Sequence, residues 1–269
     1  EQAKFRAQEP YGALRVLIKH YPEIFGRRYK FKALRRKVYP LALVCAFDMT
    51  GPTMEEIYRL CPVALDDGIM TSCLYGRLDA LKWLLQKQPK SIKKVDEDGN
   101  LPLHYASMGF SIDVVSYVYD LHPASLLVGN KNGATPLHFA CWSSDLPLVE
   151  FLMKKDSGAI RMRDSDGCTP FFYSLVNQVN LDVAEYLLFV FPELLRTKTT
   201  KGSMFLPLHY ACYNSETTDI IIQLLDKYPE AVKEKDAENL SPLDLASKNP
   251  YLSKDDVSLI SARIQQVKK

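Results

Sequence analysis

A short motif centred on proline recurs along the chain at a nearly constant spacing. The motif prolines are Pro102, Pro136, Pro170, Pro207 and Pro242, so successive copies are separated by 34, 34, 37 and 35 residues. Self-similarity at one such period is typical of chains built from stacked units, in which each unit buries its apolar face against its neighbours. The repeat is therefore the main constraint on what this chain can fold into.

Each residue of the motif has a physical role. The fullest copy is Thr135-Pro136-Leu137-His138, which follows Gly133. Glycine permits the positive φ of a tight turn, and threonine at positions such as Thr135 and Thr169 can cap the start of a helix. Proline suits the first helical turn because its missing N–H has no intrahelical partner there. A second helix is expected downstream in each unit, where Val114, Val115 and Val118 show the spacing of a buried helical stripe.

These residues resemble the ankyrin repeat, whose signature is a glycine-containing turn followed by Thr-Pro-Leu-His-x-Ala. The resemblance implies an all-α solenoid of stacked helix-turn-helix pairs with a concave groove. It also implies hydrogen bonds between adjacent turns from the motif histidines, which are His104, His138 and His209 here. The outer helices end in an x-Pro step, as at Phe191-Pro192, where the family commonly has Gly-Ala-Asp. In this respect the chain is similar to a proline-exit variant of algal and protist ankyrin-repeat proteins.

The repeat predicts one ankyrin-repeat domain over residues 1–269, with about seven repeats and an N-terminal half repeat. Residues 1–95 contain degenerate repeats, 96–247 contain the clear ones, and 248–269 contain a C-terminal capping helix that begins at Ser253. Within the degenerate part, we expect outer helices over 11–20, 54–60 and 79–85. Inner helices are expected near 40–45 and 68–76.

Composition narrows the class of protein. The chain is 47% hydrophobic and 25% charged, which is ordinary for a folded protein, and its net charge of +2 gives no global field for nucleic acid. No stretch approaches the roughly 18 apolar residues of a membrane-spanning helix. Cys45, Cys141 and Cys212 each follow a repeat proline by five residues, at a small buried position, so we interpret them as reduced core residues. Reduced thiols favour an intracellular location. The cytoplasm is the first expectation, and the nucleus or an organelle stays open because residue 1 is Glu rather than Met.

Catalytic and metal-binding motifs are missing from the sequence. There is no G-x-S-x-G, H-E-x-x-H or Gly-rich phosphate loop, and no CxxC pair. Asp164 and Asp166 are interpreted as turn formers rather than as an acid–base pair. We therefore predict a protein that is not an enzyme and that uses no cofactor or metal.

Large side chains recur at one position of the repeat, six residues after the motif proline. In the resembling family, contacts with partners come from this part of the inner helix and from the turn tips. Trp, Tyr and Met are enriched in interface cores, although core packing is the alternative explanation. Pro207 follows Gly202 by five positions instead of three, so this turn is expected to carry two further contacts at its tip, unless the extra length is tolerated drift. The predicted partner-binding residues are Tyr75, Met108, Trp142, Val176 and Tyr213, with Met204 and Phe205 at the longer turn.

A basic segment near the N-terminus offers a second kind of site. It has seven basic residues in eleven positions, with no acid, and two interleaved aromatic residues: Arg27, Arg28, Lys30, Lys32, Arg35, Arg36 and Lys37. Such a cluster can bind phosphates or an acidic partner, or it can be a solvated loop. We therefore predict a scaffold or adaptor that binds a partner protein in its groove. This protein can also be a subunit of a larger assembly. The alternative is an RNA- or phosphate-binding subunit that uses residues 27–37. Membrane insertion is not expected.

Overall fold

The structure is a computed structural model. It describes residues 20, 21, 23, 29–31, 36–38, 41, 42, 45, 52–176, 181–202 and 204–267.

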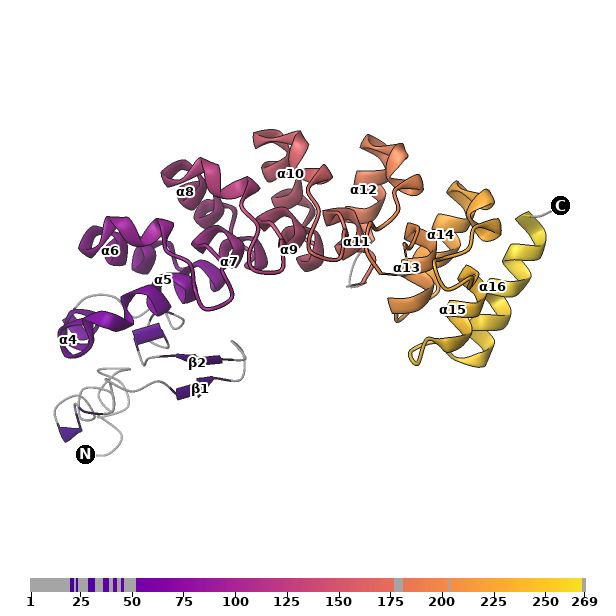
Figure 1. Cartoon of the computed structure of the whole chain (residues 1–269). Coiled ribbons are helices and arrows are strands. Elements are labelled where there is room, and N and C mark those ends of the chain that lie inside the picture. Colours follow the sequence, from indigo (N-terminus) through magenta and orange to yellow (C-terminus); the bar gives the residue numbers. More distant parts are fainter. Residues whose placement is uncertain are drawn as a thin grey trace, which may run out of the picture.

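Pairs of antiparallel helices stack side by side into a curved solenoid, as the repeat predicts (Figure 1). The inner helices follow the concave side: α5 (Leu65–Leu74), α7 (Pro102–Met108), α9 (Pro136–Ser143), α11 (Pro170–Ser174), α13 (Pro207–Asn214) and α15 (Pro242–Lys248). The outer helices follow the convex side: α4 (Pro52–Leu60), α6 (Leu78–Lys87), α8 (Ile112–Leu121), α10 (Leu146–Lys155), α12 (Asp182–Val190), α14 (Asp219–Lys227) and α16 (Lys254–Val267). The all-α repeat architecture is thus confirmed for this part of the chain.

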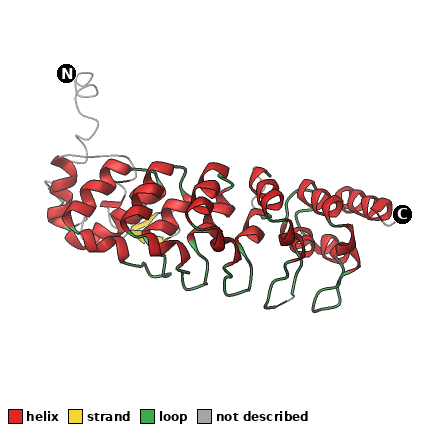
Figure 2. Ribbon diagram, turned by 90° about the horizontal axis from the view of Figure 1, so that it is seen from above, coloured by secondary structure: helices red, strands yellow, loops and turns green. Residues whose placement is uncertain are grey.

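The N-terminal part departs from the prediction in one respect. The basic segment contains two short antiparallel strands, β1 (Tyr29–Phe31) and β2 (Arg36–Val38), in which Lys30 pairs with Lys37. This hairpin was not predicted, because two strands of three residues carry no repeat signal. The hairpin lies on the concave side, below α5 and α7 (Figures 1 and 2). Residues 41, 42 and 45 are helical, in agreement with the inner helix expected there, whereas nearly all of the helix expected over 11–20 lies outside the described residues.

The core follows the repeat register. Leu103, Leu137 and Leu208 from the inner helices are almost fully buried, and so are the valines of α8. Deleting one such side chain typically costs about 2–5 kcal/mol. All six cysteines are free and buried, as predicted for the three at the repeat position. Burial raises the pKa of the Cys45 thiol to about 12, so this thiol is protonated and inert near neutral pH.

The outer helices end as the x-Pro steps predict. A short 3₁₀ turn begins at the exit proline in five cases: Pro62–Ala64, Pro89–Lys93, Pro123–Leu127, Pro192–Arg196 and Pro229–Lys233. Proline fits this place because it fixes φ and disfavours helix at the preceding residue. The loops that follow lead to the next inner helix and project from one edge of the solenoid (Figure 2).

These loops are closed by side chains that accept backbone N–H groups. The Asp96 Oδ1 atom accepts from the N–H groups of Asp98 and Asn100, at 2.9 and 2.8 Å. Asp164 does the same for Asp166 and Cys168, so Asp164 is a turn former, as predicted. Neighbouring turns are also linked directly, for example through the N–H of Lys131 and the carbonyl of Asp98 at 2.9 Å.

The motif histidines have two different environments. The Nε2 atoms of His104 and His138 each lie 3.1 Å from a carbonyl oxygen of the next turn, which confirms the bridging role for these two. At both, Nδ1 accepts the backbone N–H of the residue that precedes the helix, Leu101 or Thr135, which is the contact that a side chain at the third helical position makes in a capping box. His209 is fully buried, yet neither ring nitrogen has a hydrogen-bond partner in the described part of the chain. Its ring stacks on Phe205 of the longer turn instead, so the bridge predicted for it is missing.

Candidate partner-binding groove

The last turns of two inner helices present large aromatic side chains. Trp142 of α9 is 45% exposed and Tyr213 of α13 is 49% exposed, whereas their neighbours Cys141 and Cys212 are fully buried. The reason is helical geometry, since consecutive side chains on a helix point about 100° apart. The repeat position therefore places both rings at the surface of the inner-helix layer, which follows the concave side.

Tyr75 and Met108 lie together at the N-terminal end of this layer. With Leu74 and Phe110 they line a shallow open pocket of about 430 Å³ between the ends of α5 and α7. Tyr75 and Met108 are only partly exposed, and Met108 packs against the core. Phe110 is 79% exposed and was not predicted. It directly follows Gly109, at the end of the inner helix, and that position is the signal that could have identified it.

The longer turn brings its two predicted residues to the same surface. Met204 is exposed and has a φ of 51°, a conformation that residues other than glycine rarely adopt. Phe205 is half-buried, and its ring centroid lies 5.7 Å from that of Tyr213. A pocket of about 280 Å³ beside Phe205 has Tyr173, Tyr210 and Lys201 among its walls. The turn and the α13 position thus form one aromatic surface.

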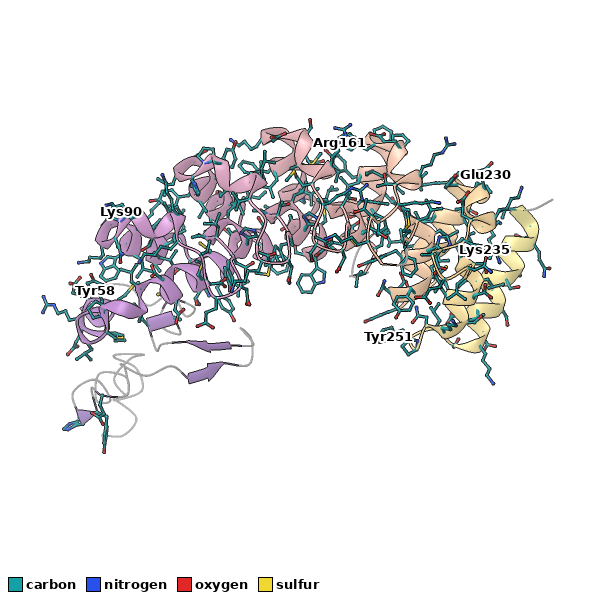
Figure 3. All side chains as sticks on the ribbon, viewed as in Figure 1. Tyr58, Lys90, Arg161, Glu230, Lys235 and Tyr251 are labelled. Carbon is teal, nitrogen blue, oxygen red and sulfur yellow. The ribbon has the colours of Figure 1, made fainter. Side chains whose placement is uncertain are left out.

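The predicted line of residues is not uniformly exposed. Val176 is half-buried, and residues 177–180 next to it are outside the described part of the chain. Tyr251, which sequence reasoning missed, is exposed near α15 and α16, on the concave side (Figure 3). It lies after the last inner helix, beyond the clear repeats, so no periodic signal pointed to it.

The structure describes the basic segment only in part. Lys30 lies in β1, and Arg36 and Lys37 lie in β2. The remaining predicted members are outside the described residues: Arg27, Arg28, Lys32 and Arg35.

The described residues otherwise form contact surfaces. Among them, no three His, Cys, Asp or Glu side chains converge as metal ligands would. Within the same residues, every helix is too short or too polar to cross a bilayer. What the groove offers chemically is aromatic and thioether surface beside polar turn tips, which suits binding of another macromolecule.

Stacked helix pairs, bridging histidines and proline-initiated inner helices define a helical-repeat solenoid. Comparison with protein families gives its name: residues 66–118 match the model described as ankyrin repeats in many copies, and residues 118–197 match the model of three ankyrin repeats. Residues 66–197 are therefore ankyrin repeats.

A solved structure shows a similar chain. It is the complex of a predatory endopeptidase from Bdellovibrio bacteriovorus with an immunity protein, and the matching chain is 26% identical with a TM-score of 0.57. The match covers 72% of the present chain and 96% of the other. No curated protein matches the chain.

Proposed function

We propose that this chain is a non-catalytic adaptor that binds a partner protein along its concave groove. Ankyrin repeats are generally protein-interaction modules, and the similar chain described above comes from a complex of two proteins. The observation that carries the proposal is the shared exposure of Trp142 and Tyr213, because two large rings at one repeat position lie on one face of the solenoid.

The proposed contact surface has three parts. At one end, the pocket of Tyr75, Met108 and Phe110 would take an apolar side chain of the partner. Trp142 lies in the middle of the inner-helix layer. At the other end, Tyr213 is the main contact, with Val176 between it and Trp142 and with the longer turn of Met204 and Phe205 at the rim. Trp and Tyr dominate binding energy in many interfaces because they bury much area with few rotatable bonds.

A second candidate function is RNA or phosphate binding through residues 27–37. The observation that favours it is the density of positive charge in this segment, together with the position of the β1–β2 hairpin on the concave side. Salt separates the two functions. Phosphate contacts release counterions, so binding of RNA would weaken steeply between low and physiological salt. Binding centred on aromatic side chains would change little.

The experiment is a native pull-down with mass spectrometry on the full chain. Three baits are compared: wild type, Trp142→Ala/Tyr213→Ala, and Gln86→Ala, an exposed residue of the outer helix α6, as a surface control. We expect a protein that wild type and Gln86→Ala retain and that the double variant loses. Retention of the same proteins by all three baits would contradict groove binding, and recovery of nuclease-sensitive material would favour the second function.

A further inference from the structure

One apolar side chain on the convex side departs from the register of its repeat. Phe189 of α12 is 85% exposed, the highest value among the large apolar residues described. It is the third residue before its exit proline. At the corresponding position the outer helices α4, α6, α8, α10 and α14 carry exposed polar residues, which are Arg59, Gln86, Asp120, Lys154 and Asp226. Single exposed apolar side chains are common on protein surfaces, so the significance of Phe189 depends on the cleft beside it and on Tyr186, which lines the same cleft.

Phe189 borders a cleft on the convex side. The cleft has a volume of about 700 Å³ and opens between α12 and α14, with Tyr186 and Phe189 on one side and Gln223 on the other. These two outer helices have few direct contacts, whereas α10 packs on α12 and α14 packs on α16. We name it the α12–α14 cleft.

The charge of this cleft is acidic. Asp182 and Glu185 line it, and α12 contains no Lys or Arg. The Glu185 carboxylate accepts a hydrogen bond from the Gln223 side chain at 2.7 Å, which holds the carboxylate in place. Asp226, which also lines the cleft, forms an ion pair with Arg263 at 2.7 Å. The only cation among the lining residues is Lys227. A fitting ligand is therefore a segment with several cations and at least one apolar ring.

We propose that the α12–α14 cleft receives the basic segment 27–37 of a second copy of this chain. That segment has seven cations, which can pair with Asp182 and Glu185, and it has no acidic residue. Tyr29 and Phe31 lie between these cations and can contact Phe189. Arginine also stacks favourably on exposed aromatic faces, which suits a ring that is open to solvent. The required chemistry is thus present within the chain itself.

The arrangement of the fold makes this contact intermolecular. The β1–β2 hairpin lies on the concave side below α5 and α7, whereas α12 and α14 lie on the convex side, several repeats away (Figure 1). Each copy would use its segment on one neighbour and its cleft on another. Such contacts form a closed assembly where the rotation between copies closes and an open chain where it does not, and in both cases association increases with concentration.

The first test is sedimentation velocity of the full-length chain over a wide range of concentration. We expect the weight-average mass of wild type to rise with concentration and to fall as salt screens the charges. Phe189→Gln should weaken association by about tenfold or more, as loss of an interface anchor does. Leu121→Gln is the matched control, since it removes an exposed apolar side chain from another outer helix, α8, and it should leave association unchanged. Circular dichroism verifies that both variants are folded.

Charge exchange tests the identity of the occupant. Asp182→Lys/Glu185→Lys and Arg35→Glu/Arg36→Glu/Lys37→Glu should each be monomeric, and their mixture should associate because each then carries the complement of the other. A wild type that stays monomeric throughout would overturn the proposal, as would equal losses in the Phe189 and Leu121 variants. Two further results would also overturn it: no recovery in the mixture, and association that nuclease abolishes.

Discussion

The ring of Phe172 lies edge-on against that of Tyr210, with their centroids 5.1 Å apart, across the longest step of the repeat. One repeat earlier, the same position is His138, which bridges to the next turn and lies 2.9 Å from the Thr135 hydroxyl. With phenylalanine there, the hydroxyl of Thr169 is buried without a partner in the described structure. An apolar contact thus replaces a polar bridge where the inner helices α11 and α13 have few direct contacts.

Substitution of Trp142 tests the groove. Trp142→Ala should weaken partner binding by about 2 kcal/mol or more, because interface anchors contribute on this scale. It should lower the free energy of unfolding by less than about 1 kcal/mol, since nearly half of the side chain is already in water. Calorimetric titration with the partner from the pull-down and urea unfolding measure the two quantities.

Leu137→Ala is the control for that experiment. Leu137 is fully buried in the same helix, so its loss should destabilise the fold by about 2–5 kcal/mol. If Trp142→Ala behaves like Leu137→Ala and mainly unfolds the protein, the ring is part of the core and the groove proposal fails.

The bridging histidines predict a dependence of stability on pH. Burial lowers the pKa of His104 and of His138 to about 4, from an ordinary value of 6.5. As the pH falls below 6.5, the unfolded chain binds protons before the folded one, so stability is lost between about pH 6.5 and pH 4. Together the two pKa shifts correspond to a loss of several kcal/mol in the free energy of unfolding, at about 1.4 kcal/mol for each pKa unit.

Urea unfolding at a series of pH values measures this loss. In His104→Gln/His138→Gln the slope over the same interval should be largely removed, although the variant is less stable at pH 7. A double variant that keeps the wild-type slope would show that other groups control the acid sensitivity.

The turn carboxylates contribute to stability through the N–H groups they accept. Burial alone would raise the pKa of Asp96, but hydrogen bonds from the Tyr105 hydroxyl and from the N–H groups of Asn100 and Asp98 outweigh it and lower the pKa. Asp96→Ala would leave these donors without an acceptor, so we expect a loss of about 1–3 kcal/mol in urea unfolding. Asp98→Ala, at an exposed position of the same turn, should change stability by about 0.5 kcal/mol or less. Equal effects of the two would contradict this role.

The repeat fold was predictable because the spacing of the motif residues in the sequence determines which side chains are buried between neighbouring repeats. The spacing of the motif prolines identified α7, α9, α11, α13 and α15, and the exit prolines located the ends of most outer helices. Local helix signals were enough for α4, α6 and α16, although α5 begins at Leu65, three residues earlier than the glycine that marked it. Once the repeat unit is recognised, stacking of each unit on its neighbours leaves few alternative arrangements of the helices.

The candidate site was predictable only in part. Sequence position identified Trp142 and Tyr213, but the exposure of Tyr75, Met108 and Val176 depends on how neighbouring repeats pack, which one repeat cannot encode. Phe189 lies on an outer helix, where the inner-helix motif gives no signal, and the loss of the His209 bridge accompanies stacking of its ring on Phe205 of the longer turn. The β1–β2 hairpin depends on pairing between strands of three residues, which is too short to give a pattern.

Substitution of two turn glycines allows the cost of backbone strain to be measured apart from the cost of a steric clash. Gly133 and Gly202 both have a positive φ, at 73° and 63°. A Cβ atom on Gly133 would lie 3.0 Å from Asp164 Cα of the next turn, whereas one on Gly202 would have nothing within 4 Å. Gly202→Ala should therefore lower the free energy of unfolding by only about 1 kcal/mol, the cost of a left-handed conformation for a residue with a Cβ atom. Gly133→Ala should lose that amount and also push adjacent turns apart, which weakens the bond between Ser165 N–H and the Asn132 carbonyl. We expect a clearly larger fall in melting temperature for Gly133→Ala, with faster amide exchange at Ser165. Equal falls for the two variants would mean that the turns do not support one another.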